Sequence, residues 1–341
     1  MPGPALPEIL RSPVVVAPMG GGPSTPDLVV AAARAGAFGF LAGGYKTVAA
    51  LRADMDAVRA ATGEPFGVNV FLPGAPTGDP VGMSAYLESL QGDAAALGVE
   101  IGQPAWSDDA WESKVDMLLT QPPAVVSFTF GCPPPEVVHA VQAAGCSVWV
   151  TVTSESEAQQ AAAAGADCLC VQGEEAGAHR GCFTNDAGAL NGHPLVQLLR
   201  QASQATGLPT VAAGGIMDHQ GVEAALAAGA LAVQCGTAFL RCPESGTSPA
   251  HRAALEDPQF TATAVTRAFS GRPARGLVNR FIRDHPGAPA AYPEINSATR
   301  PLRAAATAAG DVHRMSLWAG TGWRSGRSLH AGEVVQMLLG R

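Results

Sequence analysis

At 341 residues the chain is long enough for two average domains, but α/β barrels of this length also form one. A hydrophobic content of 47% and a charged content of 15% provide for a large core and argue against disorder. The formal net charge is −8, and the only lysines are Lys46 and Lys114. Without a basic cluster, the sequence predicts no nucleic-acid partner.

The N-terminal segment, the length of the apolar runs and the cysteines indicate the cellular compartment. Segment 1–13, MPGPALPEILRSP, lacks a positive region followed by an apolar core, so we expect no signal peptide. No apolar run reaches membrane-spanning length, so we expect no membrane helix. Seven cysteines with no CxxC or metal-ligand spacing predict reduced, mostly buried thiols, no metal site and a cytoplasmic protein. Nothing in these patterns specifies an oligomeric state.

One short pattern repeats along the chain: an alanine-rich helix ends in glycine, and a short apolar strand follows. A left-handed glycine ends a helix, and a proline shortly afterwards prevents its continuation. The turns are of two kinds, Ala-Gly and Thr-Gly-x-Pro, with glycines at 36, 145, 165 and 229 and at 63 and 207. The expected strands cover 13–17, 38–41, 66–71, 124–128, 147–150, 167–171, 209–212 and 231–235.

Eight strands alternating with helices predict a parallel (β/α)8 TIM barrel forming one domain over 1–341. Continuous apolar runs suit strands buried on both faces. Excursions 72–122 and 241–330 exceed the repeat and are expected to cover the carboxyl-terminal face as a lid. Trp106 and Trp111 are expected on helices of the first, and a final helix over Glu333–Leu339 should pack on the body.

The first and third strands end in residues that suit a flat ligand. A glycine run follows Ala17-Pro18-Met19 and would let backbone approach closely, which makes Ala17 and Met19 candidate cofactor contacts; a plain flexible turn is the alternative. Asn69 could hydrogen-bond a heterocycle edge, or could simply form a turn.

The sixth strand carries the strongest signal, Gln172-Gly-Glu-Glu-Ala-Gly-Ala-His179-Arg180-Gly181. Imidazole titrates near neutrality, so His179 could accept a proton or stabilise an anion. A structural histidine is the alternative, but the flanking glycines and the strand-end position favour function. Arg180 could contact an anion or be an ordinary ion-paired loop residue. The remaining histidines, including His193 and His219, are interpreted as surface or capping residues.

The stretch Leu208–Leu240 contains two glycine turns at successive strand ends. Backbone N–H groups around Gly215, Gly236 and Thr237 could hold a phosphate, or the glycines could only permit tight turns. Cys235 lies among these residues, although a small buried thiol suffices to explain it. P-loop, Rossmann, GxSxG and HExxH motifs are absent.

Together these segments resemble the nitronate monooxygenase family, formerly called 2-nitropropane dioxygenases. The resemblance spans residues 13 to about 280, and its motifs are APMGG (17–21), NVF (69–71), QGEEAGAHRG (172–181), AAGGI (212–216), QCGTAFL (234–240) and FSGRPARGLVNRF (269–281).

The resemblance implies an FMN-dependent barrel that oxidises alkyl nitronates, or nitroalkanes, with O2 to a carbonyl compound and nitrite. It assigns His179 as catalytic base and places the phosphate against Gly215, Gly236 and Thr237. The implied FMN-binding residues are Asn69, Gln172, Gly177, Gly215, Gln234, Cys235, Gly236 and Thr237. Ala178 departs from the family, which commonly has glycine there, and its methyl could narrow the loop around His179.

Two other enzyme classes share parts of this pattern. An NAD(P)H-dependent flavin reductase, such as enoyl-acyl-carrier-protein reductase, has a similar barrel and glycine–histidine loop. A phosphate-binding isomerase or aldolase would need a catalytic lysine or carboxylate at a strand end, and Asp167 and the two lysines are not so placed.

Overall fold

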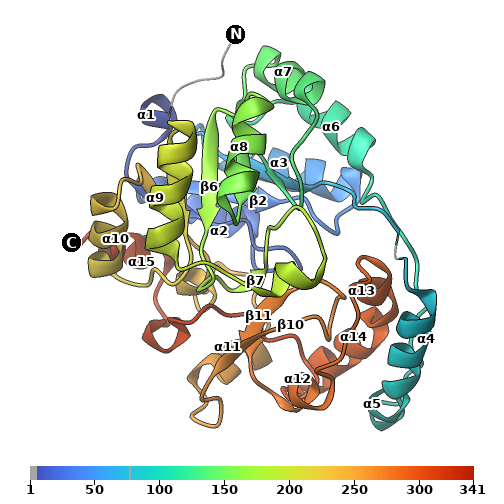
Figure 1. The fold of residues 1–341 in the computed structure, drawn as a ribbon. Coiled ribbons are helices and arrows are strands. Elements are labelled where there is room, and N and C mark those ends of the chain that lie inside the picture. The colour runs from blue at the N-terminus through green and yellow to red at the C-terminus, as the bar shows by residue number, and fades with distance from the viewer. Residues whose placement is uncertain (1–5, 77) are drawn as a thin grey trace.

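The computed structural model describes residues 6–76 and 78–341. Eight parallel strands close a barrel, so the predicted fold and number of barrel strands are confirmed (Figure 1). The barrel strands, in order, are β1 (Val14–Val16), β2 (Phe38–Ala42), β3 (Gly67–Phe71), β4 (Val125–Thr129), β5 (Ser147–Val152), β6 (Cys168–Gln172), β8 (Thr210–Ala213) and β9 (Ala232–Cys235).

Helices surround the barrel, and most end as the repeat predicts, with left-handed glycines at 36, 145, 165, 207 and 229. The prediction is wrong at Gly63, because α3 ends at Ala61 and its C-cap is Thr62, which is extended. The expected last helix is confirmed as α15, which packs on α2 and α10. The surrounding helices are α1 (Leu6–Ile9), α2 (Pro26–Arg34), α3 (Val48–Ala61), α6 (Trp111–Thr120), α7 (Pro135–Ala143), α8 (Glu155–Ala163), α9 (Leu195–Thr206), α10 (His219–Ala227) and α15 (Ala331–Leu338).

The segment after β9 forms a second layer beside the barrel's carboxyl-terminal face (Figure 1). Its centre is a three-stranded antiparallel sheet in which β7, from the His179 loop, pairs with β11. The additional elements are β7 (Ala178–His179), η1 (Ala187–Leu190), η2 (Thr237–Phe239), α11 (Pro249–Glu256), β10 (Thr263–Thr266), β11 (Ala274–Leu277), α12 (Arg280–Asp284), α13 (Glu294–Ala298), α14 (Arg300–Ala309) and η3 (Trp323–Ser325).

The first excursion supports this layer from outside. Helices α4 (Pro80–Ser89) and α5 (Gln91–Ala96) lie beside α12–α14 (Figure 1), and Leu90 joins Phe269, Phe281 and Ile295 in one buried cluster. Trp111 begins α6, but the expected helix at Trp106 is wrong, because that residue lies in irregular chain before α6.

The inward-facing barrel positions change character along the strands. Near the amino-terminal end they form an apolar plug in which Trp149 packs against Phe38 and Phe40, with ring centroids 6.0 and 5.4 Å away. Two residues further along β5 the inward position is polar, at Thr151. This switch closes one end of the barrel and leaves the other open to ligand.

The cysteines are all unpaired and, apart from partly exposed Cys132, buried, as predicted. None of the helices in the described residues combines the length and the apolar character that a membrane crossing requires.

Candidate active site

A cavity of about 790 Å³ lies above the carboxyl ends of the barrel strands. All eleven residues that the sequence nominated as catalytic or cofactor-binding line it: Ala17, Met19, Asn69, Gln172, Gly177, His179, Gly215, Gln234, Cys235, Gly236 and Thr237. The second wall comes from 241–330, whereas the described residues of 72–122 contribute nothing to the lining. The volume lies in the range of sites for cofactors and drug-sized ligands.

Asn69 belongs to the polar floor of this cavity. Its Nδ2 donates to the Ser127 carbonyl oxygen at 3.2 Å, to Ser127 Oγ at 2.9 Å and to Thr129 Oγ1 at 3.0 Å. These three bonds fix the orientation of the amide. Asn69 is therefore pre-organised to present its oxygen to a ligand.

Gln172 holds the histidine loop rather than extending a free amide. Its Nε2 donates to the His179 carbonyl oxygen at 3.1 Å, and its Oε1 accepts from the Gly181 N–H at 2.7 Å. Both ends of the amide are therefore used within the chain. The side chain lines the cavity but acts chiefly as a clamp on the loop.

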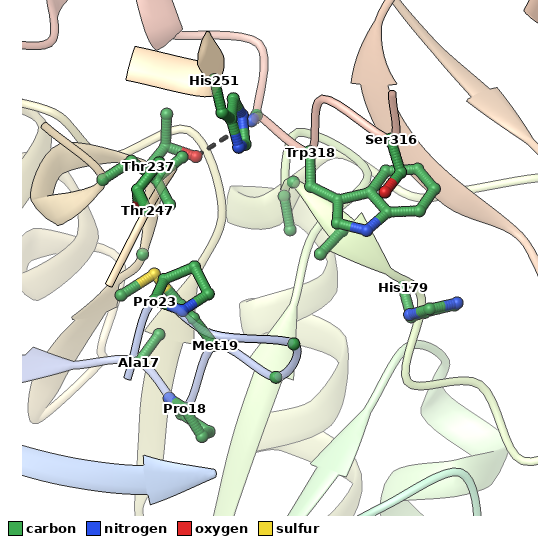
Figure 2. A pocket seen from close by; sticks show the side chains of 18 of the residues that line it. Ala17, Pro18, Met19, Pro23, His179, Thr237, Thr247, His251, Ser316 and Trp318 are labelled. Carbon is green, nitrogen blue, oxygen red and sulfur yellow. Dashed lines mark hydrogen bonds between the residues drawn. The ribbon is translucent and has the colours of Figure 1, made fainter. Parts of the chain in front are cut away.

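His179 lies in β7, opposite Ala274 of β11. Its Nε2 is 2.8 Å from Ser270 Oγ, and that hydroxyl donates to the Arg272 carbonyl oxygen at 3.2 Å. This arrangement favours a hydrogen on Nε2 and leaves the second ring nitrogen free to accept a proton. Figure 2 shows the imidazole below Trp318, whose ring centroid lies 5.6 Å away.

The environment of His179 keeps it neutral. Burial, followed by the positive charges of Arg272 and Arg303, lowers the pKa of His179 to about 3. Desolvation and nearby cations both disfavour imidazolium. A bound anion would act in the opposite direction and raise that pKa.

Ala178 has a backbone conformation that favours glycine. Its φ is +62°, in the left-handed region that L side chains rarely adopt. The preceding Gly177 is also constrained, because a Cβ there would lie 2.5 Å from the Ala319 carbonyl carbon. The alanine therefore strains the backbone, and His179 still lies in the cavity wall.

The two glycine turns form an anion cradle. Gly214 and Gly215 have φ values of +126° and +71°. Within the described chain, the N–H groups of Gly215, Gly236 and Thr237 donate no hydrogen bond. Thr237 Oγ1 accepts from the Gly320 N–H at 2.9 Å, which fixes this side chain at the cavity edge (Figure 2). Free backbone N–H groups at successive strand ends suit a phosphate.

The remaining nominated residues shape the walls. Met19 is held by a bond from its N–H to Ser24 Oγ at 2.8 Å, and the Ala17 N–H donates to the Cys235 carbonyl oxygen at 3.0 Å. Gln234 Nε2 donates to Cys170 Sγ at 3.1 Å. Burial raises the pKa of Cys235 to about 12, so this thiol is no nucleophile at neutral pH.

Several lining residues escaped the sequence interpretation. His251, expected on the surface, is buried and lines the cavity, and burial lowers its pKa to about 4 (Figure 2). His285 is a capping residue, at the carboxyl end of α12, although it is buried and lies 2.8 Å from Asp93. Arg303 and Trp318 come from the second layer. No strand-end pattern marks them, because they lie in a segment outside the barrel repeat.

Tyr45 is another cavity residue that the sequence pattern does not mark, and an ion pair whose lysine is buried positions it. Lys114 is 1% exposed and lies 2.7 Å from Asp109 Oδ2, whereas Asp109 Oδ1 accepts from the Tyr45 N–H at 3.0 Å. Tyr45 has a φ of +66° and lines the cavity. Its hydroxyl accepts from the hydroxyl of Tyr292, whose ring centroid lies 5.9 Å from that of His179.

Comparison with known proteins agrees with this geometry. The sequence model described as nitronate monooxygenase matches residues 4–340. A nitronate monooxygenase of Pseudomonas aeruginosa is 42% identical over 97% of this chain and 96% of its own length. The chain belongs to the nitronate monooxygenase family. Members of this family are flavin-dependent oxidoreductases, and this chain is an enzyme of that class.

A further sequence relative and two solved structures are also similar to this chain. A probable nitronate monooxygenase of Bacillus subtilis is 35% identical over 93% of this chain and 91% of its own length. The solved structure of nitroalkane oxidase from Streptomyces ansochromogenes has a TM-score of 0.96 and 46% identity, covering 99% of this chain and 97% of that one. FabK from Thermotoga maritima has a TM-score of 0.71 and 25% identity, covering 97% and 92%.

Proposed function

We propose that this enzyme binds FMN and oxidises alkyl nitronates, and more slowly nitroalkanes, with O2 to a carbonyl compound and nitrite, with His179 as the catalytic base for nitroalkanes. The observation that carries the proposal is one cavity combining free backbone N–H groups at two glycine turns with a neutral, partly buried histidine beside cationic side chains. FMN, when bound, supplies the redox chemistry between substrate and O2, while the chain supplies position and electrostatics.

The described residues fit FMN. The free N–H groups of Gly215, Gly236 and Thr237 would hold its phosphate. The oriented oxygen of Asn69 would accept from the flat ring system, and the glycine run after Met19 would let backbone lie close to it. No lysine or arginine lines the cradle itself, so backbone dipoles would provide its attraction for phosphate.

The electrostatics favour nitronate over neutral nitroalkane as the substrate. A base with a pKa of about 3 is inefficient at removing a proton near neutral pH. Nitronate arrives already deprotonated, and its charge is stabilised by the cations beside His179. His179 then orients the bound anion, and its role as base is confined to the slower reaction with nitroalkane.

An absorption spectrum followed by anaerobic mixing tests this function. Purified protein should show flavin bands, and the released flavin should be FMN. Nitronate should bleach the flavin rapidly, and aerobic turnover should consume O2 and yield nitrite. Rapid bleaching by NADH or NADPH, with none by nitronate, would instead identify the NAD(P)H-dependent flavin reductase that is the alternative from the sequence. A colourless protein with no affinity for flavin would contradict both.

A further inference from the structure

The second layer brings an arginine to the cavity beside His179. Arg303 lies on α14, on a face that lines the cavity together with Arg300, Ala304, Thr307 and Ala308. Its guanidinium is held in place: Nε donates to Thr299 Oγ1 at 3.1 Å, and Nη2 donates to the carbonyl oxygen and Oδ1 of Asn296 at 2.9 and 2.8 Å. Arg303 is therefore partly buried and fixed in orientation.

Arg303 has no counterion in the described chain. No carboxylate there lies within ion-pair distance of it, and its Nη1 donates no hydrogen bond. The charged and titratable groups around it are Arg300, Tyr45 and Tyr292, with His179 and Arg272 beyond. Burial raises the pKa of both tyrosines, so neither supplies a negative charge near neutral pH. A partly buried cation without an anion is unfavourable unless a ligand brings one.

The neighbouring arginines are less suited to that ligand. Arg272 is buried outside the cavity lining, stacks over the Phe130 ring at 4.0 Å and donates to the Cys182 carbonyl oxygen. Arg300 is exposed to solvent, which screens its charge. Arg303 alone of the three is both oriented and open to the cavity.

We propose that Arg303 binds the anionic oxygens of the substrate and is the residue that makes the site select nitronate over neutral nitroalkane. The inference rests on the proposed function, since it assigns the group that recognises the nitronate charge. A guanidinium presents planar donors that match a planar oxyanion, and the resulting hydrogen bonds are charge-assisted. Arg303 and His179 would then contact the same ligand from two elements far apart in sequence.

Binding of nitrite to the holoenzyme, measured by calorimetry, tests this assignment without turnover. Nitrite is a small planar oxyanion, so it reports on the anion site even if nitronate is not the substrate. Arg303→Met should weaken nitrite binding about 10- to 100-fold, as expected for loss of a charge-assisted hydrogen bond. Arg303→Lys should recover part of that loss because it retains the charge. Arg200→Met is the matched control, since Arg200 is exposed on α9 outside the cavity.

Steady-state kinetics then test selectivity. In Arg303→Met the KM for nitronate should rise about 10-fold or more, while the KM for neutral nitroalkane should stay within about twofold. Unchanged nitrite binding in Arg303→Met, or an equal loss in Arg200→Met, would overturn the assignment. Loss of flavin from both Arg303 variants would also overturn it, because the arginine would then serve the cofactor. If the wild type binds nitrite through Arg303 but does not oxidise nitronate, the proposed function fails and the anion site stands.

Discussion

The two ends of the cavity are built in different ways. At the glycine turns, the groups offered to a ligand are backbone N–H groups of Gly215, Gly236 and Thr237, which follow barrel strands β8 and β9. At the other end, the groups are side chains: His179, Arg303 and Trp318. The first end depends on the local turn, whereas the second depends on how the outer layer packs against the barrel.

This difference separates binding of the cofactor from reaction with the substrate. Backbone donors at a strand end are fixed by the barrel and carry no proton that titrates near neutral pH. The side-chain end carries the histidine and the cations whose balance sets the protonation state of the site. Changes at one end should therefore affect cofactor retention, and changes at the other should affect substrate handling.

The largest effect is expected from breaking the ion pair between the buried Lys114 and Asp109, which supports the side-chain end. Lys114→Met leaves the partly buried Asp109 without its cation and should destabilise the enzyme by about 2–3 kcal/mol, measured by denaturant unfolding. Lys46→Met is the matched control, because the Lys46–Asp54 pair is partly exposed and should contribute at most about 1 kcal/mol. Equal losses in both variants would show that burial of Lys114 has no special role.

A second variant changes the backbone end. In Gly215→Ala the added Cβ would lie 3.0 Å from Glu175 Cβ, at a φ of +71°. We expect the strained turn to cost roughly 1–2 kcal/mol, which would weaken FMN binding about 10-fold. Flavin release during dialysis measures this. Gly207→Ala, at a similar φ of +67° at the end of α9, should lower stability but retain flavin. Flavin retention by Gly215→Ala equal to that of wild type would contradict the cradle.

The pH dependence of stability tests the environment of the two cavity histidines. His179 and His251 have folded-state pKa values of about 3 and about 4, below the value of about 6.5 expected on unfolding. Between these values only the unfolded chain takes up the protons, so stability should fall as pH decreases from about 6.5 towards 4. Each histidine should contribute up to about 1.4 kcal/mol per pH unit. His251→Gln should flatten the slope, whereas the exposed His139→Gln should not.

The smallest expected effect is an increase in stability. Ala178→Gly should relieve the left-handed backbone at φ +62° and stabilise the enzyme by up to about 1 kcal/mol, seen as a higher midpoint of thermal unfolding. Ala176→Gly, in the same loop but without a positive φ, provides the comparison. A lower midpoint for Ala178→Gly would show that the methyl contributes packing that outweighs its strain.

The backbone end was predictable from sequence because its glycines directly follow apolar strand runs in a regular repeat. The motif at 172–181 likewise predicts from sequence alone that His179 is a site residue. Arg303, Tyr45 and Trp318 were not predictable, because their positions depend on packing between segments separated by many residues. Gln172 shows the same limit within a motif: its place was predicted, but its use as a clamp on the loop depends on the folded path of that loop.

The most direct test compares His179→Ala with wild type, after both have been shown to contain equal amounts of FMN. The account predicts that turnover of neutral nitroalkane falls about 10²- to 10⁴-fold, the range for loss of a general base, while turnover of nitronate falls less. A variant that retains FMN and oxidises neutral nitroalkane at the full rate would contradict the role of His179 as the base.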